Sequence, residues 1–333
     1  MNNSMKGRNI LITGGAGFIG SHLVDRLLAA GDRLVVLDNF NDYYDPQKKR
    51  RNIAAHLAHP AYRLVEGDLR DEAKLRDVFS TAPFDVVVHL AAMAGVRPSL
   101  AQPAYYMDVN VNGTQKLIDK IIDHSPKARL IFGSSSSVYG NRSGEMFLET
   151  DRVDQPLSPY AASKAAGELI SYSAHHTRGL NVVCLRFFTV FGPRQRPDLA
   201  IHKFCKLILK GEPVEVYGDG STRRDYTFVS DIVDGITSAM TYDLPGYDII
   251  NLGRSEPVIL MDMIRALEES LERKANIVHK PLQIGDMPYT YAGIEKARQL
   301  LGYEPRVSFE EGVRRFVEWY LAARADSPLE VKT

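Results

Sequence analysis

The sequence predicts an α/β fold with a doubly wound parallel sheet, and three observations carry this prediction. Short runs of apolar, often β-branched residues alternate with longer amphipathic segments through the first half of the chain. The runs are apolar throughout, as expected for strands that helices cover on both faces. A turn containing Gly14, Gly15, Gly17 and Gly20 joins the first run to the first helix, a junction typical of such sheets.

The expected elements follow one another in regular order. Strands are predicted at 9–13, 33–37, 62–65, 85–90, 129–132 and 181–186, and helices at 17–29, 71–80, 105–123 and 159–176. After residue 190, segments rich in Gly, Pro and Arg separate shorter helices at 200–210, 229–239 and 260–271. We therefore expect a Rossmann-type domain over residues 1–190 and a smaller mixed α/β C-terminal domain over 191–333, interleaved with the first.

Composition excludes several classes of protein. The 333 residues include 41 Lys and Arg and 41 Asp and Glu, so the formal net charge is zero. A neutral chain lacks the field that attracts nucleic acid or an anionic membrane, and neither partner is expected. No apolar run is long enough to span a bilayer or serve as a signal peptide. Cys184 and Cys205 are expected in the core of a cytoplasmic protein, with no disulfide and no metal site.

The glycine turn is the first candidate binding site. Gly14, Gly17 and Gly20 permit a tight turn and a close approach of the backbone to a diphosphate. The diphosphate would rest on amide groups at the start of the following helix, where Phe18 and Ile19 lie. The pattern follows a strand and opens a helix, which is the context that a dinucleotide site requires.

Asp38 ends the second predicted strand and indicates which dinucleotide binds. A carboxylate there accepts hydrogen bonds from an adenosine ribose and repels a 2′-phosphate, so NAD is favoured over NADP. Asn39, where an NADP enzyme would have an arginine, agrees. Asp68 is a candidate for the adenine amino group. Other cofactor-binding candidates at strand ends are Leu69, Leu90, Ala91 and Ala92.

Tyr160 and Lys164 are the candidate catalytic pair. They lie one helical turn apart and so share a face. An ammonium group beside a phenol lowers the pKa of the phenol, and a cationic nicotinamide adds to this effect, which makes Tyr160 a general base. Ser135, at the end of the fifth strand, is positioned to relay the proton. His89 lies within an apolar strand and is expected to be a packed, hydrogen-bonded core residue.

These motifs together resemble the extended short-chain dehydrogenase/reductase family, in its sugar-nucleotide branch. The resemblance rests on TGGAGFIG, Asp38, HLAA, GSSSSVYG and YAASK, and it covers nearly the whole chain. It implies tightly bound NAD⁺ and a catalytic set of Tyr160, Lys164 and Ser135. It also implies that Asn110, which shapes the helix near the active site, binds the cofactor together with Tyr160 and Lys164. It also implies a homodimer built on the helix of Tyr160 and the helix at 105–123.

Within this branch the segments DNFNDYYDP, RFFTVFGP, RPD and RRDYTFV are most similar to those of UDP-glucuronate 4-epimerases. The resemblance implies that a UDP-sugar contacts Ser135, Ser136, Thr189, Arg196, Arg224 and Asp286. Arg196 and Thr189 would meet the sugar carboxylate, because a guanidinium offers a carboxylate two parallel hydrogen bonds. Arg224 would hold the diphosphate, and Asp286 would lie near the uridine ribose or that arginine.

Other chemistries of the branch differ at identifiable positions. Related 4,6-dehydratases and uronate decarboxylases carry an acidic residue just before the VYG motif, where this chain has Ser136 and Ser137. UDP-galactose 4-epimerases carry asparagine at the position of Thr189. A UDP-galactose or UDP-N-acetylhexosamine 4-epimerase, a UDP-uronate decarboxylase and a non-catalytic NAD sensor remain as alternatives.

Positive charge is expected to gather at the substrate end despite the zero net charge. Arg194, Arg196, Arg223 and Arg224 fall in two segments predicted to be loops that face the same cleft. Such a cluster would focus positive potential where a diphosphate and a carboxylate bind. Arg223 could instead be a surface charge only.

Overall fold

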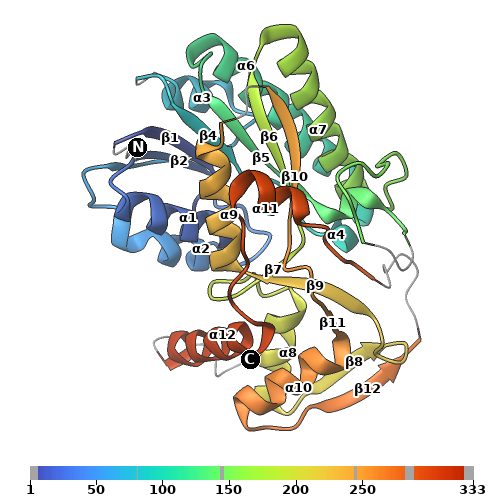
Figure 1. Ribbon diagram of the computed structural model, residues 1–333. Helices are drawn as coiled ribbons and strands as arrows, with labels where there is room; N and C mark the ends of the chain where they lie inside the picture. Colours follow the sequence, from blue (N-terminus) through green and yellow to red (C-terminus); the bar gives the residue numbers. More distant parts are fainter. Residues whose placement is uncertain (1–6, 81, 143–145, 244–245, 282–288, 326–333) are drawn as a thin grey trace.

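Seven parallel strands form the large sheet of the molecule, in the spatial order β3–β2–β1–β4–β5–β6–β10 (Figure 1). The computed structural model describes residues 7–80, 82–142, 146–243, 246–281 and 289–325. The strands are β1 (Asn9–Thr13), β2 (Arg33–Asp38), β3 (Tyr62–Glu66), β4 (Val86–His89), β5 (Arg129–Ser135), β6 (Asn181–Phe187) and β10 (Tyr247–Leu252). The predicted doubly wound fold is confirmed.

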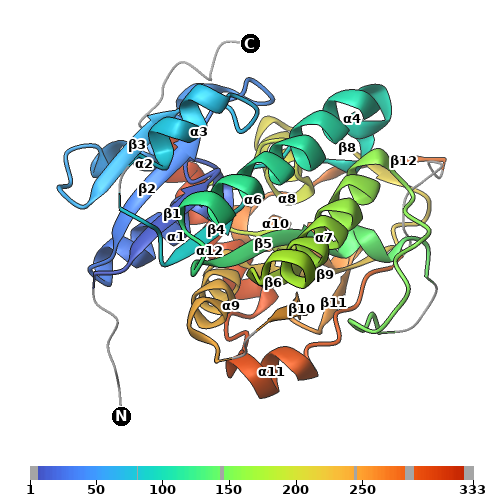
Figure 2. The same ribbon diagram turned by 90° about the horizontal axis from the view of Figure 1, so that it is seen from above.

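Successive residues of a strand point to opposite faces of the sheet, so strands that are apolar throughout give the sheet two apolar faces. Helices cover both of these faces. Ile10 and Ile12 of β1 pack on the side of α1 (Phe18–Ala29) and α9 (Val229–Thr241). Leu11 packs on the other side, in a core that also receives residues of three further helices. These are α3 (Glu72–Val78), α6 (Gly113–His124) and α7 (Pro159–Arg178) (Figure 2).

The helix predicted at 105–123 is interrupted by a π-helical turn. It consists of α5 (Pro103–Met107), the π-helical turn η2 (Asp108–Asn112) and α6. A π turn changes the angular position of the residues that follow, and the apolar spacing of the sequence does not reveal it. The other elements predicted in the first half differ from the observed ones by three residues or fewer at their ends.

Residues after 190 form a smaller lobe below the large sheet in Figure 1 and also return to that sheet. Its three-stranded sheet consists of β7 (Thr189–Phe191), β9 (Arg223–Phe228) and β11 (Pro257–Ile259). Its two-stranded sheet pairs β8 (Pro213–Tyr217) with β12 (Asn276–Lys280). Its helices are α8 (Ala200–Lys210), α10 (Leu260–Leu271) and α12 (Phe309–Ala325). The chain then connects back, since β10 pairs with β6 and α11 (Glu295–Leu301) contacts β10 and α9.

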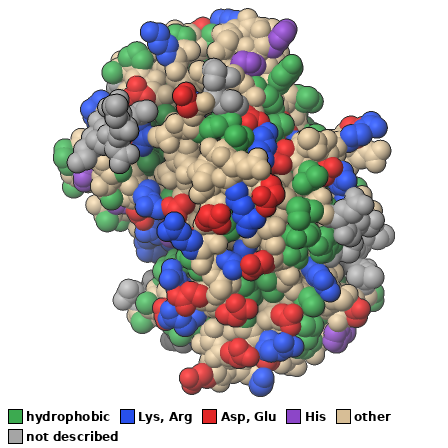
Figure 3. All heavy atoms as spheres, in the orientation of Figure 1, with side chains coloured by type: hydrophobic (Ala, Val, Ile, Leu, Met, Phe, Trp, Pro, Cys, Tyr) green, Lys and Arg blue, Asp and Glu red, His purple; other side chains and the backbone are tan. Residues whose placement is uncertain are grey.

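Short helices complete the first half: α2 (Pro46–Ile53), α4 (Val96–Ala101), and the 3₁₀ turns η1 (Ala54–His56) and η3 (Ser136–Tyr139). Cys184 and Cys205 are both buried free thiols, as predicted. Within the described ranges no helix is long and apolar enough to cross a membrane. Charged side chains of both signs are interspersed on the face seen in Figure 3, in keeping with the zero net charge.

Candidate functional site

A cavity of about 1140 Å³ lies where the carboxyl ends of the large sheet meet the smaller lobe. Residues that end or follow β1 to β6 line one side, and residues of the second half line the other. Of the predicted site residues, the cavity lining contains Gly14, Gly17, Phe18, Ile19, Gly20, Asp38, Asn39, Asp68, Leu69, Leu90, Ala91, Ala92, Ser135, Ser136, Tyr160, Lys164, Thr189, Arg196 and Arg224. Asn110 is not in the lining, and Asp286 lies outside the described residues.

The glycine turn is packed so closely that side chains would not fit. Gly14 has φ +74°, and a Cβ there would lie 2.8 Å from the backbone nitrogen of Ala91. A Cβ on Gly20 would lie 2.2 Å from the carbonyl oxygen of Gly14. Helix α1 starts next to this turn without a side-chain cap, so its first amide groups are available to an anion. The turn therefore fits the diphosphate of a dinucleotide.

Asp38 is a buried carboxylate at the end of β2, within the cavity lining. Its oxygens accept hydrogen bonds from the backbone N–H of Ala16 at 3.1 Å and of Phe40 at 2.9 Å. Burial raises the pKa of Asp38, while the Phe40 hydrogen bond and the charge of Lys49 oppose the rise. A carboxylate has about four acceptor positions, so these two bonds leave capacity for ribose hydroxyls. This residue therefore fits NAD.

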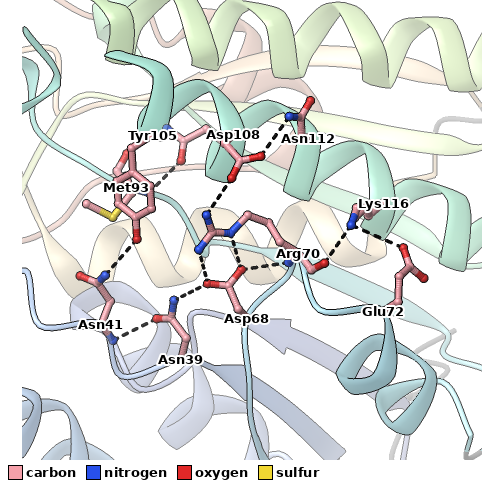
Figure 4. A network of polar contacts seen from close by, with 11 residues as sticks. Asn39, Asn41, Asp68, Arg70, Glu72, Met93, Tyr105, Asp108, Asn112 and Lys116 are labelled. Atoms are coloured by element: carbon pink, nitrogen blue, oxygen red, sulfur yellow. Dashed lines mark hydrogen bonds and ion pairs between the residues drawn. The ribbon is translucent and has the colours of Figure 1, made fainter. Parts of the chain in front are cut away.

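Asp68 belongs to a polar network at the same edge of the sheet (Figure 4). Its oxygens accept two hydrogen bonds from the Arg70 guanidinium, each at 2.9 Å, and one from Asn39 Nδ2 at 3.0 Å. The Arg70 hydrogen bonds lower the pKa of Asp68 to about 2. Arg70 also reaches Asp108 and stacks over the Tyr105 ring. Asp68 is thus already engaged by side chains that the sequence analysis did not pair with it.

His89 joins strand β4 to β1 and to the helix behind it. The Thr13 Oγ1 and His89 Nδ1 atoms are 2.7 Å apart, and His89 Nε2 lies 2.9 Å from Thr114 Oγ1. Since Thr114 Oγ1 donates to the Asn110 carbonyl, it accepts the Nε2 proton, and Nδ1 accepts from Thr13. Burial, together with the charge of Lys164, lowers the pKa of His89 to about 3. His89 is a neutral core residue, as expected.

Tyr160 and Lys164 project from the start of α7, next to the end of β5. Ser158 caps this helix by accepting from the Ala161 N–H at 3.1 Å, and Pro159 occupies its first position. Lys164 Nζ donates to the Gly133 carbonyl oxygen at 2.6 Å, and burial lowers the pKa of Lys164 to about 8. Burial and a fixed carbonyl partner therefore make this lysine a positioned donor in the cavity.

The pKa of Tyr160 differs from the expectation. Burial raises it above the ordinary value of 10, and it is opposed by a hydrogen bond with Ser135 and by the charge of Arg196. Lys164 is not among the side chains that lower the pKa of Tyr160. Desolvation of a buried phenolate explains the difference, because it exceeds the effect of these neighbours. Ser135 lies close enough to Tyr160 to lower this pKa, and the proton relay stays a prediction.

Asn110 lies behind the cavity wall, within the π-helical turn. Its side chain donates to the Met93 carbonyl and to Ser163 Oγ, each at 2.9 Å, and accepts from the Met93 N–H at 2.8 Å. Ser163 directly precedes Lys164. Asn110 therefore ties the loop after β4 to the helix that carries the candidate catalytic pair.

Two of the four expected arginines face the cavity. Arg196 and Arg224 line it. The prediction that Arg194 also faces the cavity is wrong, and for Arg223 the alternative of a surface charge is confirmed. Arg194 instead forms an ion pair with Asp25 of α1 at 2.7 Å, and Arg223 is exposed at the start of β9. The 223–224 segment is also a strand and not a loop, since it pairs with β11.

Further residues that were not predicted from the sequence lie beside the predicted ones. Tyr43 and Asp198 line the cavity beside Arg196, and both fall in segments singled out from the sequence, DNFNDYYDP and RPD. Ser137 is in the lining as well, and its buried hydroxyl has no hydrogen-bond partner among the described residues. No three His, Cys, Asp or Glu side chains of the described ranges group as a metal site.

The chain is similar in sequence and structure to known proteins. The family model described as GDP-mannose 4,6 dehydratase matches residues 11–316. UDP-glucuronate 4-epimerase 4 of Arabidopsis thaliana is 40% identical, over 95% of this chain and 76% of that protein. UDP-glucuronate 4-epimerase of Thermodesulfobacterium geofontis is 40% identical, over 93% and 95%. UDP-glucuronic acid 4-epimerase of Bacillus cereus, solved with UDP-glucuronic acid and NAD, superimposes with a TM-score of 0.88 at 34% identity, over 95% and 99%.

Proposed function

The chain belongs to the extended short-chain dehydrogenase/reductase family, and from this we propose that it interconverts UDP-glucuronate and UDP-galacturonate with NAD as cofactor. One observation carries the proposal: a single cavity is lined by the glycine turn, by Tyr160 and by Arg196. Reversible oxidation at C4 of an acidic sugar requires a dinucleotide, a base and a group that binds the carboxylate. The glycine turn, Tyr160 and Arg196 are the candidates for these three roles, in that order.

Tyr160 acts as the base on the sugar 4-hydroxyl in this proposal. Its phenol oxygen would remove the 4-hydroxyl proton with Ser135 as the relay, and would give a proton back to the C4 oxygen once the hydride has returned to the opposite face of C4. When bound, NAD⁺ would supply a reversible acceptor for the C4 hydride and a positive charge that lowers the pKa of the phenol. Gly14, Gly20 and Asp38 would hold that cofactor.

Inversion requires that the 4-keto sugar turn while the nucleotide stays in place. Arg224, on β9, is the candidate for holding the UDP diphosphate. Asp286, the predicted contact of the uridine ribose or of that arginine, lies outside the described residues. Binding energy is then spent on the part of the substrate that does not react, which leaves the sugar free to rotate. We assign NAD binding mainly to residues 1–190 and UDP-sugar binding mainly to residues 191–333.

Ser136 and Ser137 favour epimerisation over the dehydratase chemistry for which the family model is named. Water elimination needs an acid at this point, and hydroxyl groups do not supply one. The 4-keto form of a uronate is a β-keto acid that can lose carbon dioxide. Thr189 and Arg196 would orient the carboxylate so that the bond to C6 avoids overlap with the ketone π system.

The proposal extends to assembly and location. Leu169 and Tyr172 on α7 are exposed apolar side chains, which supports a homodimer that buries this helix. The two free buried thiols suit a cytoplasmic enzyme. Gel filtration with light scattering and cell fractionation test these two points.

The test of the activity is incubation of the purified protein with UDP-glucuronate and no added cofactor. Chromatography should reveal UDP-galacturonate, with at most a small share of UDP-pentose, and heat denaturation should release NAD. Turnover of UDP-glucose or UDP-N-acetylglucosamine without turnover of UDP-glucuronate would instead support an alternative 4-epimerase. UDP-pentose as the main product would identify a decarboxylase.

A further inference from the structure

We propose that Tyr43 and Asp198 are positioning residues that determine the preference for an acidic sugar, because they fix the guanidinium of Arg196. The inference rests on the proposed function and deepens it. Asp198 lies two residues after Arg196 in the second half of the chain, whereas Tyr43 comes from the loop between β2 and α2 in the first half. Specificity would thus depend on both sides of the cavity.

Asp198 occupies one edge of the guanidinium. Arg196 Nε donates to Asp198 Oδ1 at 3.0 Å, and Arg196 Nη2 donates to Asp198 Oδ2 at 2.6 Å. This bidentate pair sets the plane of the guanidinium. Burial alone would raise the pKa of Asp198, but the Arg196 hydrogen bonds and charge bring it below its ordinary value. Asp198 is therefore a permanent anionic partner.

Tyr43 contacts both members of this pair. Its hydroxyl donates to Asp198 Oδ2 at 3.2 Å, and the Arg196 Cζ atom lies 5.2 Å from the centre of its ring. Burial raises the pKa of Tyr43, so the hydroxyl keeps its proton and remains a donor. The Tyr43 ring therefore supports the guanidinium of Arg196 directly, through a cation–π contact. The Tyr43 hydroxyl supports it indirectly, because it holds the carboxylate of Asp198 to which the guanidinium is bound.

The loop that carries Tyr43 is itself held in place. The Tyr43 N–H donates to Asn41 Oδ1 at 2.7 Å. Figure 4 shows the second link, in which Asn41 Nδ2 donates to the Tyr105 hydroxyl at 3.3 Å. A Cβ on Gly95 would lie 2.9 Å from the Tyr43 hydroxyl oxygen, so the chain after β4 passes directly beside it. Tyr43 is thus a fixed support and not a loose side chain.

This arrangement presents a defined edge of Arg196 to a ligand. A guanidinium carries five N–H groups, and the Asp198 pair uses those of the Nε–Nη2 edge. The Nη1–Nη2 edge has the spacing for a second bidentate carboxylate. Because Asp198 balances the positive charge, the preference for a uronate depends on the direction of that edge more than on net charge. A misaligned guanidinium would lose affinity for the carboxylate but not for the UDP part.

Equilibrium binding in a Tyr160→Phe background tests this without turnover. The measured quantity is the ratio of the dissociation constants of UDP-glucose and UDP-glucuronate, by calorimetry. Adding Tyr43→Phe removes only the hydroxyl, and we expect the preference for UDP-glucuronate to fall roughly five- to tenfold. Asp198→Glu keeps the charge but moves the carboxylate, and should reduce the ratio in the same direction. UDP-glucose affinity should stay within about twofold for both.

Tyr242→Phe is the matched control. It removes a tyrosine hydroxyl that also donates to an aspartate at 3.2 Å, to Asp248, and Tyr242 is not in the cavity lining. Its ratio should equal that of the parent. An unchanged ratio in Tyr43→Phe, or an equal loss for both ligands, overturns the inference. A parent that does not prefer UDP-glucuronate would overturn the proposed function instead, which keeps the two failures distinct.

Discussion

The two sides of the cavity differ in the kinds of residue that line them. On the side of the large sheet the lining includes the close-packed glycine turn and small residues that follow strands, such as Gly14 and Ala91, beside the charged side chains of Asp38 and Lys164. On the side of the smaller lobe it depends on charged side chains, above all Arg196, Asp198 and Arg224. A backbone surface fixed by a sheet suits a ligand that stays bound. Charged side chains suit a ligand that arrives, turns and leaves.

The largest effect is expected where the two sides meet, at Tyr160. Tyr160→Phe should lower kcat by about 10²–10⁴-fold, because the general base for the 4-hydroxyl is lost while the ring is kept. NAD content and the dissociation constant of UDP-glucuronate should change little, as measured by heat release and calorimetry. Activity close to that of the parent would mean that another group is the base.

Arg224→Ala tests the side of the smaller lobe. We expect KM for the UDP-sugar to rise roughly 10- to 100-fold, since charged hydrogen bonds to the diphosphate are lost, with NAD content unchanged. Arg223→Ala is the matched control, because this neighbour on β9 is exposed and outside the cavity lining. Loss of NAD in Arg224→Ala would contradict the division of labour between the two sides.

Gly20→Ala tests the side of the large sheet and should have the reverse effect. The new Cβ would lie 2.2 Å from the Gly14 carbonyl oxygen, so the turn must shift. We expect a loss of about 1–3 kcal/mol in the free energy of unfolding and a lower NAD content, while UDP binding is retained. Denaturant unfolding and cofactor release measure both. Full NAD content in this variant would show that the turn does not hold the cofactor.

A pH effect is expected at His89, which is buried on the large-sheet side. Its pKa of about 3 lies below the ordinary value of 6.5, so between these values the unfolded chain binds a proton that the folded chain does not. Stability is therefore lost as the pH falls from 6.5 towards 3, by about 1.4 kcal/mol per pH unit for this group. In His89→Gln the free energy of unfolding, measured with denaturant at several pH values between 4.5 and 7, should depend less steeply on pH by that amount. An unchanged slope would mean that other groups cause the acid sensitivity.

The sequence predicts the side of the large sheet better than the side of the lobe, for a physical reason. Buried parallel strands require apolar runs, and a tight turn requires glycine, so β1 and Gly14 are visible in local sequence. The strands of the lobe have three to six residues and many half-exposed positions, which gives no such run. The sequence analysis therefore predicted only helices there by range.

Side-chain partners were the least predictable feature. The spacing of Tyr160 and Lys164 along one helix is local, and it places both in the cavity lining. The pairs of Arg70 with Asp68 and of Arg194 with Asp25 depend on how separate segments meet in space. A residue type at a motif position indicates what chemistry is possible, whereas its tertiary neighbours decide what it contacts.

The return of β10 to the large sheet has a consequence for how the chain folds as it is synthesised. β6 is complete at Phe187, but its partner on the outer side ends at Leu252, after the first half of the smaller lobe has been made. Until then β6 presents an unpaired edge that can join another chain. We therefore expect a pause in synthesis or a truncation within this interval to favour aggregation of the chain.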